Sequence, residues 1–197
     1  MLFRSKWNGP ADLLVEKGRV AAIDKPGKLQ AKAKAIKAES LNAKGLFLLP
    51  GLIDLNCRIH EPGAEHVENF STGSKAAAAG GFTTLLVQPF SEPTHDNAFM
   101  TDFILRRARE HSSVRIVPMG ALSHGREGKR LSEIGAMAAA GARAIGDSVP
   151  VENSYLMRKA LEYARAFSLP VFSLPMDMAL TGQGVMSEGW NSRSEEH

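Results

Sequence analysis

One short stretch of the sequence, GLIDLNCRIHEPG at residues 51–63, gathers side chains of the kind that bind metal ions or substrates. In an extended strand, alternate side chains share a face. The face predicted here carries Asp54, Asn56, Arg58 and His60. An arginine does not bind metal ions, and an asparagine is a poor ligand for a transition metal. This face alone therefore does not supply the ligands of a transition-metal site.

The histidines and the single cysteine leave open a second possible metal site. Cys57 and His60 could bind zinc together with His66, although on a strand Cys57 and His60 point in opposite directions. A position facing solvent or at the edge of the core is favoured for them. His95 and His124 follow predicted strands and could reach a site from loops. None of the histidines has the spacing of H-x-H or H-E-x-x-H.

Two acidic residues follow later strands. Asp147 ends a strand in AIGDSVP, and Asp177 follows another in LPMDMAL. In a barrel enzyme, an acid at the carboxyl end of a strand could bind a metal or act as a base. It could equally cap the next helix or face solvent. The stretch HGREGKRL lacks the pattern of a phosphate-binding loop, and no Ser/His/Asp arrangement can be assigned.

The elements that position these residues follow from hydrophobic periodicity. Five apolar, strand-like runs begin near residues 52, 82, 114, 142 and 170 and alternate with helical patterns. Asp96 or Asn97 is expected to cap one helix, and Asn153 or Ser154 another. Such βα repeats form either an open doubly wound sheet or a (β/α)8 barrel. Residues 1–50 instead predict a small β module, with a hairpin turning at Lys17-Gly18, ahead of a βα domain at 51–197.

Composition narrows the class of protein. The chain of 197 residues is 44% hydrophobic and 23% charged, as is ordinary for a soluble globular protein. It has no apolar run of roughly 20 residues, no export signal and one cysteine, so a cytoplasmic location without membrane contact is expected. The net charge of +3 comes largely from KPGKLQAKAKAIKAES, which lacks interleaved aromatic residues. We expect a solvated surface there and no nucleic-acid partner.

The run LPGLIDLNCRIHEPGAEHVENFSTGSKAAAAGGFTTLLVQPFSEPTHDN resembles dihydroorotase, a cyclic amidohydrolase of pyrimidine biosynthesis. VPMGALSHGREGKRLSEIGAMAAAGARAIGDS and LMRKALEYARAFSLPVF continue the resemblance over almost the whole chain. It implies an α/β fold, a partial (β/α)8 TIM barrel of the metal-dependent hydrolase type. About five βα units would form this barrel, beside a small, sandwich-like N-terminal β module. The family also implies zinc, which acidifies a bridging water and polarises the ring amide carbonyl.

Several positions depart from the family pattern. The first-strand motif is Asp-x-His-x-His, followed two positions later by Arg. Here Asp54 is kept, whereas Asn56 and Arg58 stand at the ligand histidines and His60 at the substrate-binding arginine. Arg58 is always charged, so a metal ion beside it would meet like charge.

Later strands depart as well. The family usually shows Pro-Asn-Thr after the second strand, where this chain has Phe90 after the proline, and His-x-Glu-Asp after the fifth, where it has Leu174. Asp147 matches an acidic metal position. The resemblance therefore implies a degenerate site with no catalytic and no metal-binding residues. Its former positions are Asp54, Asn56, Arg58, His60, Phe90, Asp147 and Leu174.

We therefore expect a non-catalytic dihydroorotase-like protein without a metal cofactor. Such members of the family support the assembly of aspartate carbamoyltransferase, which makes that enzyme the expected partner. The chain stops after about five βα units, so we expect a C-terminally truncated member that forms an oligomer or depends on a partner. Two alternatives stay open. One is an active zinc-dependent amidohydrolase that hydrolyses dihydroorotate, and the other is a gene fragment without function.

Overall fold

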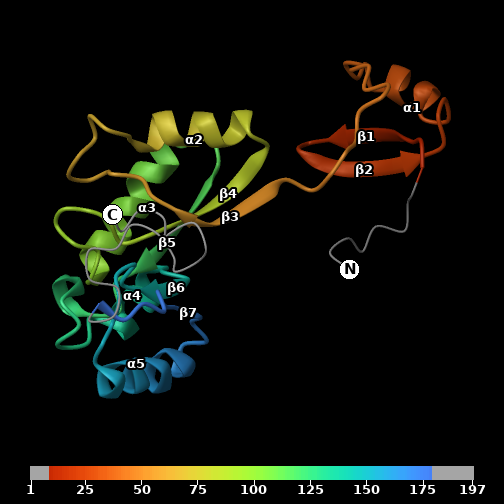
Figure 1. Ribbon diagram of the computed structural model, residues 1–197. Helices are drawn as coiled ribbons and strands as arrows, with labels where there is room; N and C mark the ends of the chain where they lie inside the picture. Colours follow the sequence, from red (N-terminus) through yellow and green to blue (C-terminus); the bar gives the residue numbers. More distant parts are fainter. Residues whose placement is uncertain (1–8, 179–197) are drawn as a thin grey trace, which may run out of the picture. The chain divides into compact units, whose positions relative to one another are not determined.

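The structure is a computed structural model that describes residues 9–178 (Figure 1). The chain divides into two compact units, and the division falls between Leu49 and Pro50. Within the described residues, no helix is both long enough and apolar enough to cross a membrane.

The first unit contains the predicted hairpin. Strands β1 (Asp12–Glu16) and β2 (Arg19–Asp24) pair antiparallel. Lys17 and Gly18 join them with φ angles of 51° and 72°, the left-handed pair that a tight two-residue turn requires. A short helix that we did not predict, α1 (Gln30–Ala35), follows in the lysine-rich segment. Alanine and lysine both favour helix, but this helix buries no residue and so has no apolar stripe to reveal it.

An exposed apolar run ends the first unit. Leu46, Phe47, Leu48 and Leu49 are 73%, 94%, 74% and 59% exposed. They lie outside any helix or strand. The described residues therefore leave four large apolar side chains in solvent.

The second unit alternates strands and helices, as the sequence predicted (Figure 1). Its elements are β3 (Leu52–Cys57), α2 (Phe70–Ala79), β4 (Phe82–Val87), α3 (Ala98–His111), β5 (Arg115–Gly120), the 3-10 helix η1 (His124–Arg126), α4 (Ile134–Ala140), β6 (Ala144–Gly146), α5 (Ser154–Ala166) and β7 (Val171–Phe172). The five strands are parallel and ordered β3-β4-β5-β6-β7. Because each strand pairs with the next along the chain, the sheet is part of a barrel and not a doubly wound sheet, whose strand order reverses. The predicted partial (β/α)8 barrel is confirmed.

Asparagine caps begin the two longest helices. The Asn97 side chain accepts the N–H of Met100 at the start of α3, and the Asn153 side chain accepts the N–H of Leu156 at the start of α5. In each case the structure selects one of the two predicted caps. Each cap satisfies a backbone donor that the helix itself leaves unpaired.

The core lies on both faces of the sheet. Successive residues of β4 point to opposite faces. Leu85 and Val87 pack against helices α2 and α3 in one cluster. Leu86 belongs to a different cluster on the other face. The helix-covered side also holds a second large cluster around α5. The opposite, inner face has a small cluster of Leu86, Met119 and Ala144. This packing fixes the strand ends at which the candidate site lies.

Candidate functional site

The candidate site begins where β3 and β4 end. Gln88 directly follows β4, and its Oε1 accepts a hydrogen bond from Nε of Arg58 at 3.1 Å. Its Nε2 donates to Oδ1 of Asn56. The structure therefore brings Asn56 and Arg58 together, as predicted for residues of one face, through a glutamine that the sequence analysis did not single out. The signal that could have found Gln88 is its position immediately after a buried strand.

An aromatic ring and two arginines extend this site. The guanidinium carbon of Arg58 lies 4.1 Å from the ring centroid of Phe90, and that of Arg126 lies 4.3 Å from the same centroid. Arg126 comes from η1, so the contact joins the ends of three consecutive barrel strands. The sequence around Arg126, HGREGKRL, suggests only a superficial likeness to a phosphate loop and gives no sign of this contact.

Two donor atoms of Arg126 lack acceptors in the part of the chain that the structure describes. Its Nε and Nη1 atoms are buried and have no hydrogen-bond partner within residues 9–178. Nδ1 of His60 is also buried and has no hydrogen-bond partner among the described residues. Arg126 also has a φ of 59°, in the left-handed region that side chains other than glycine rarely adopt. The loop after β5 therefore holds an arginine in a strained backbone position with unsatisfied donors.

Asp147 is occupied by hydrogen bonds inside the chain. It is 1% exposed at the end of β6, and its Oδ1 accepts the N–H of Ser123 at 2.8 Å. Ser123 Oγ donates to the second oxygen, Oδ2. Burial raises the pKa of Asp147, while the hydrogen bonds from Ser123 and the charge of Arg126 oppose that rise. Asp147 thus fastens the loop after β5 to the end of β6.

Neither loop histidine joins this group. His95 is 1% exposed, and its Nε2 lies 2.7 Å from Oγ1 of Thr101. Burial lowers the pKa of His95 to about 4, so the ring is neutral at neutral pH. Nδ1 of His124 lies 2.8 Å from Oδ2 of Asp96, which also accepts the N–H of Gly125 at 3.0 Å. These contacts give both histidines structural roles in holding loops.

Comparison with known proteins gives the family. The family model for dihydro-orotase-like proteins matches residues 45–194. This chain belongs to the dihydroorotase-like family. The dihydroorotase of Solibacter usitatus is 41% identical over 183 residues, which are 92% of this chain and 41% of that protein. The dihydroorotase of Geobacter metallireducens is 41% identical over 182 residues, or 92% of this chain and 42% of that protein.

A solved structure supports the fold of this dihydroorotase-like chain. L-hydantoinase (dihydropyrimidinase) from Arthrobacter aurescens superposes with a TM-score of 0.66 at 22% identity, covering 82% of this chain and 36% of that one. At this identity the likeness supports the barrel fold alone. The chain spans less than half the length of the curated dihydroorotases that it matches.

The zinc that the family implies does not fit the residues of this dihydroorotase-like chain. Within the described ranges, no three His, Cys, Asp or Glu side chains lie where they could hold a metal ion, so the alternative set of Cys57, His60 and His66 is not assembled. Burial, with the charges of Asp54 and Glu68, raises the pKa of Cys57 to about 11, which disfavours the thiolate that binds zinc. Asp54 Oδ1 accepts the N–H of Asn56 at 2.8 Å.

Leu174, after β7, is 44% exposed and has an apolar side chain that binds no metal. Asp177 lies beyond it, outside any helix or strand. Leu174 therefore supplies no metal ligand after the fifth barrel strand.

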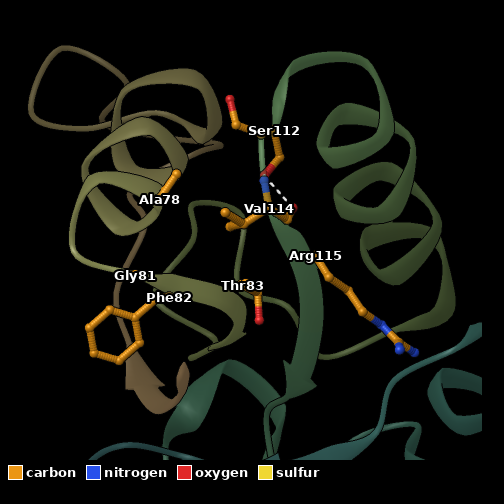
Figure 2. Close-up of a pocket in the computed structure, with 8 residues that line it drawn as sticks. Ala78, Gly81, Phe82, Thr83, Ser112, Val114 and Arg115 are labelled. Atoms are coloured by element: carbon orange, nitrogen blue, oxygen red, sulfur yellow. Dashed lines mark hydrogen bonds between the residues drawn. The ribbon is translucent and has the colours of Figure 1, made fainter. Parts of the chain in front are cut away.

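A surface hollow of about 360 Å³ lies at the other end of the strands (Figure 2). Its lining comes from the end of α2, the starts of β4 and β5 and the turn after α3, and includes Thr83, Ser112 and Arg115. Ser112 Oγ donates to the carbonyl of Val114 at 2.7 Å. In barrels of this type, the amino ends of the strands serve stability, whereas chemistry lies at the carboxyl ends. The hollow is therefore not part of the candidate site.

Proposed function

We propose that this chain is a non-catalytic, dihydroorotase-like protein of pyrimidine biosynthesis, and that it acts in the cytoplasm as a structural partner of aspartate carbamoyltransferase. Its membership of the dihydroorotase-like family supports the pathway. The residues at the strand ends support the loss of catalysis, because Asn56, Arg58 and Leu174 stand at positions where the family has ligand histidines.

The observation that most supports the loss of catalysis is the contact of Arg58 with Phe90. The guanidinium lies 4.1 Å from the ring centroid and is also held by Gln88. An arginine keeps its positive charge at any physiological pH. A divalent cation bound beside this guanidinium would therefore meet repulsion between like charges.

The uncovered edge of the sheet supports a structural partnership. Within the described residues, β3 pairs on one side only, and Leu52, Ile53 and Leu55 are 47%, 61% and 56% exposed. A strand edge with unpaired backbone groups and exposed apolar side chains readily pairs with another chain. We therefore expect the protein to be stable as an oligomer or as part of a complex.

Metal analysis and an activity assay test the catalytic half of this proposal. The purified chain is expected to contain no stoichiometric zinc by elemental mass spectrometry and to hydrolyse no dihydroorotate, with a full-length catalytic dihydroorotase assayed in parallel. Stoichiometric zinc together with turnover would overturn the proposal and restore the active amidohydrolase alternative.

Copurification with aspartate carbamoyltransferase tests the structural half. The two proteins are expected to elute together in size-exclusion chromatography, and Leu55→Lys on β3 is expected to weaken that association. Leu161→Lys on α5 is the matched control, because Leu161 is 51% exposed and lies at the other end of the sheet. Separate elution of the wild-type chain would leave the gene-fragment alternative.

A further inference from the structure

We propose that Arg58 and Arg126 form a binding site for a small oxyanion, a carboxylate or phosphate group, at the carboxyl ends of the barrel strands. Both guanidinium carbons lie within 4.3 Å of the Phe90 ring centroid. In the part of the chain that the structure describes, neither guanidinium has a carboxylate oxygen within 4.0 Å. Two permanent positive charges therefore share one aromatic ring and have no ion-pair partner.

The unsatisfied donors of Arg126 indicate the kind of ligand. The ring contact supplies no oxygen to accept its N–H groups, and its buried Nε and Nη1 have no acceptor among residues 9–178. A buried charged donor without an acceptor is costly in free energy. The two oxygens of a carboxylate or phosphate match the planar fork of N–H groups on a guanidinium. An oxyanion would thus satisfy donors that the protein leaves empty.

The neighbouring acids do not take the place of such a ligand. The charge of Asp147 lowers the positive potential around Arg126. Both carboxylate oxygens of Asp147, however, already accept hydrogen bonds from Ser123. Asp54, on β3, uses Oδ1 to accept the N–H of Asn56. Neither acid makes an ion pair with Arg58 or Arg126, so the cationic character of the site persists beside them.

Entry of the ligand depends on Arg58. Nε and Nη1 of Arg126 are screened from water, whereas Arg58 is exposed and, among residues 9–178, donates a hydrogen bond to the neutral side chain of Gln88. Arg58 is therefore the group that moves when the anion binds, and both guanidinium groups then contact it. This inference does not rest on the proposed function, because it requires neither the absence of zinc nor a protein partner.

Titration of the full chain with inorganic phosphate and, separately, with malonate tests the site. Binding is followed by calorimetry at low salt, with sodium chloride at matched ionic strength as the reference. The wild-type chain is expected to show saturable binding, which Arg126→Gln and Arg58→Gln each weaken by about tenfold. Lys129→Gln is the matched control, because it removes the same charge from the loop of Arg126 at a side chain that is 78% exposed. It is expected to change the affinity by less than about twofold, as a screened surface charge should.

The outcomes distinguish a phosphate site, a carboxylate site and the absence of an anion site. Tighter binding of phosphate than of malonate identifies a phosphate site, and the reverse order identifies a carboxylate site. Absence of saturable binding overturns the proposal, as does equal weakening by Lys129→Gln, which would indicate diffuse attraction to a basic surface. If Arg126→Gln fails to fold by circular dichroism, the exposed Arg58→Gln variant decides.

Discussion

At the scale of single residues, Phe90 is the centre of the candidate site. A phenyl ring attracts cations through its electron-rich face, and here two guanidinium groups from different strand ends use one ring. Arg126 is partly buried, so without the ring its charge would lack this contact. The ring therefore contributes to stability as well as to the position of the arginines.

Replacing this ring should lower stability. Phe90→Leu keeps an apolar side chain of similar size but removes the aromatic face, so we expect a loss of about 1–2 kcal/mol in the free energy of unfolding, measured with urea. Phe99→Leu is the control, because Phe99 is 72% exposed. Equal losses in the two variants would contradict a stabilising role for the cation–π contacts.

His95 predicts a dependence of stability on pH. Burial lowers its pKa from 6.5 to about 4, so between these pH values the unfolded chain binds a proton that the folded chain does not. Acidification therefore favours unfolding. This penalty is absent above pH 6.5 and grows to about 3 kcal/mol as the pH falls to about 4.

Urea unfolding of the wild type and of His95→Gln at about pH 7, 5.5 and 4.5 measures this dependence. The variant cannot titrate at this position, so its stability should fall less between pH 7 and 4.5. Parallel curves for the two proteins would show that His95 is protonated as easily in the folded as in the unfolded chain.

Part of the candidate site could be predicted from residue types alone. Three residues depart from the family motif and could be recognised for that reason: Asn56, Arg58 and Phe90. Asp147 could be recognised because it matches an acidic position of the family. Gln88 and Arg126 could not, because their roles depend on distances between strand ends that no local pattern encodes. The hydrogen bonds of Ser123 that occupy both oxygens of Asp147 were also not predictable, since they join loops 24 residues apart.

At the scale of elements, a buried ion pair joins the loop after β3 to two helices. Oε1 of Glu61 lies 2.7 Å from Nε and 2.6 Å from Nη2 of Arg107 on α3, and its Oε2 accepts the N–H of Phe70 at the start of α2. The Glu61 side chain is 2% exposed. These contacts therefore hold the carboxylate of Glu61 between the two helices.

Removing the arginine should destabilise this junction. Arg107→Gln leaves Glu61 buried without its partner, and because the Arg107 side chain is 36% exposed we expect a loss of about 2 kcal/mol, below that of a fully buried pair. Arg109→Gln, at an exposed position of the same helix, should cost less than about 0.5 kcal/mol. Similar losses in both variants, by urea unfolding, would count against the junction.

Most elements were predictable, because each barrel strand is an apolar run and each following helix has an amphipathic or alanine-rich pattern. The strands begin within two residues of the predicted positions, and β6 deviates most, at Ala144 in place of residue 142. The helices α1 and η1 were missed. Both are short and bury no residue, so their sequences show no hydrophobic periodicity that would predict a helix.

At the scale of the whole molecule, the chain has two units whose connecting segment lacks helix and strand. Phe47, in this segment, is 94% exposed, and Phe99, on α3, is 72% exposed. A protease needs an extended segment in its active site, which an exposed residue without secondary structure offers and a helix does not. Chymotrypsin should therefore cleave after Phe47 before it cleaves after Phe99, yielding a fragment that begins at Leu48.

Mass spectrometry of the early digestion products measures this preference. Phe99 serves as the internal control, since it offers the same side chain at a helical position. Initial cleavage after Phe99 would show that α3 opens more readily than the connection between the units.

The same apolar segment has a consequence for the life of the protein in a cell. Chaperones and quality-control proteases recognise unfolded chains by exposed apolar stretches, and a folded chain that displays Leu46 to Leu49 presents such a stretch permanently. Its steady-state abundance should then depend less on the free energy of folding than on how much of this segment is covered. A chain in which Leu46 to Leu49 are covered should therefore accumulate to a higher level than one in which they stay exposed.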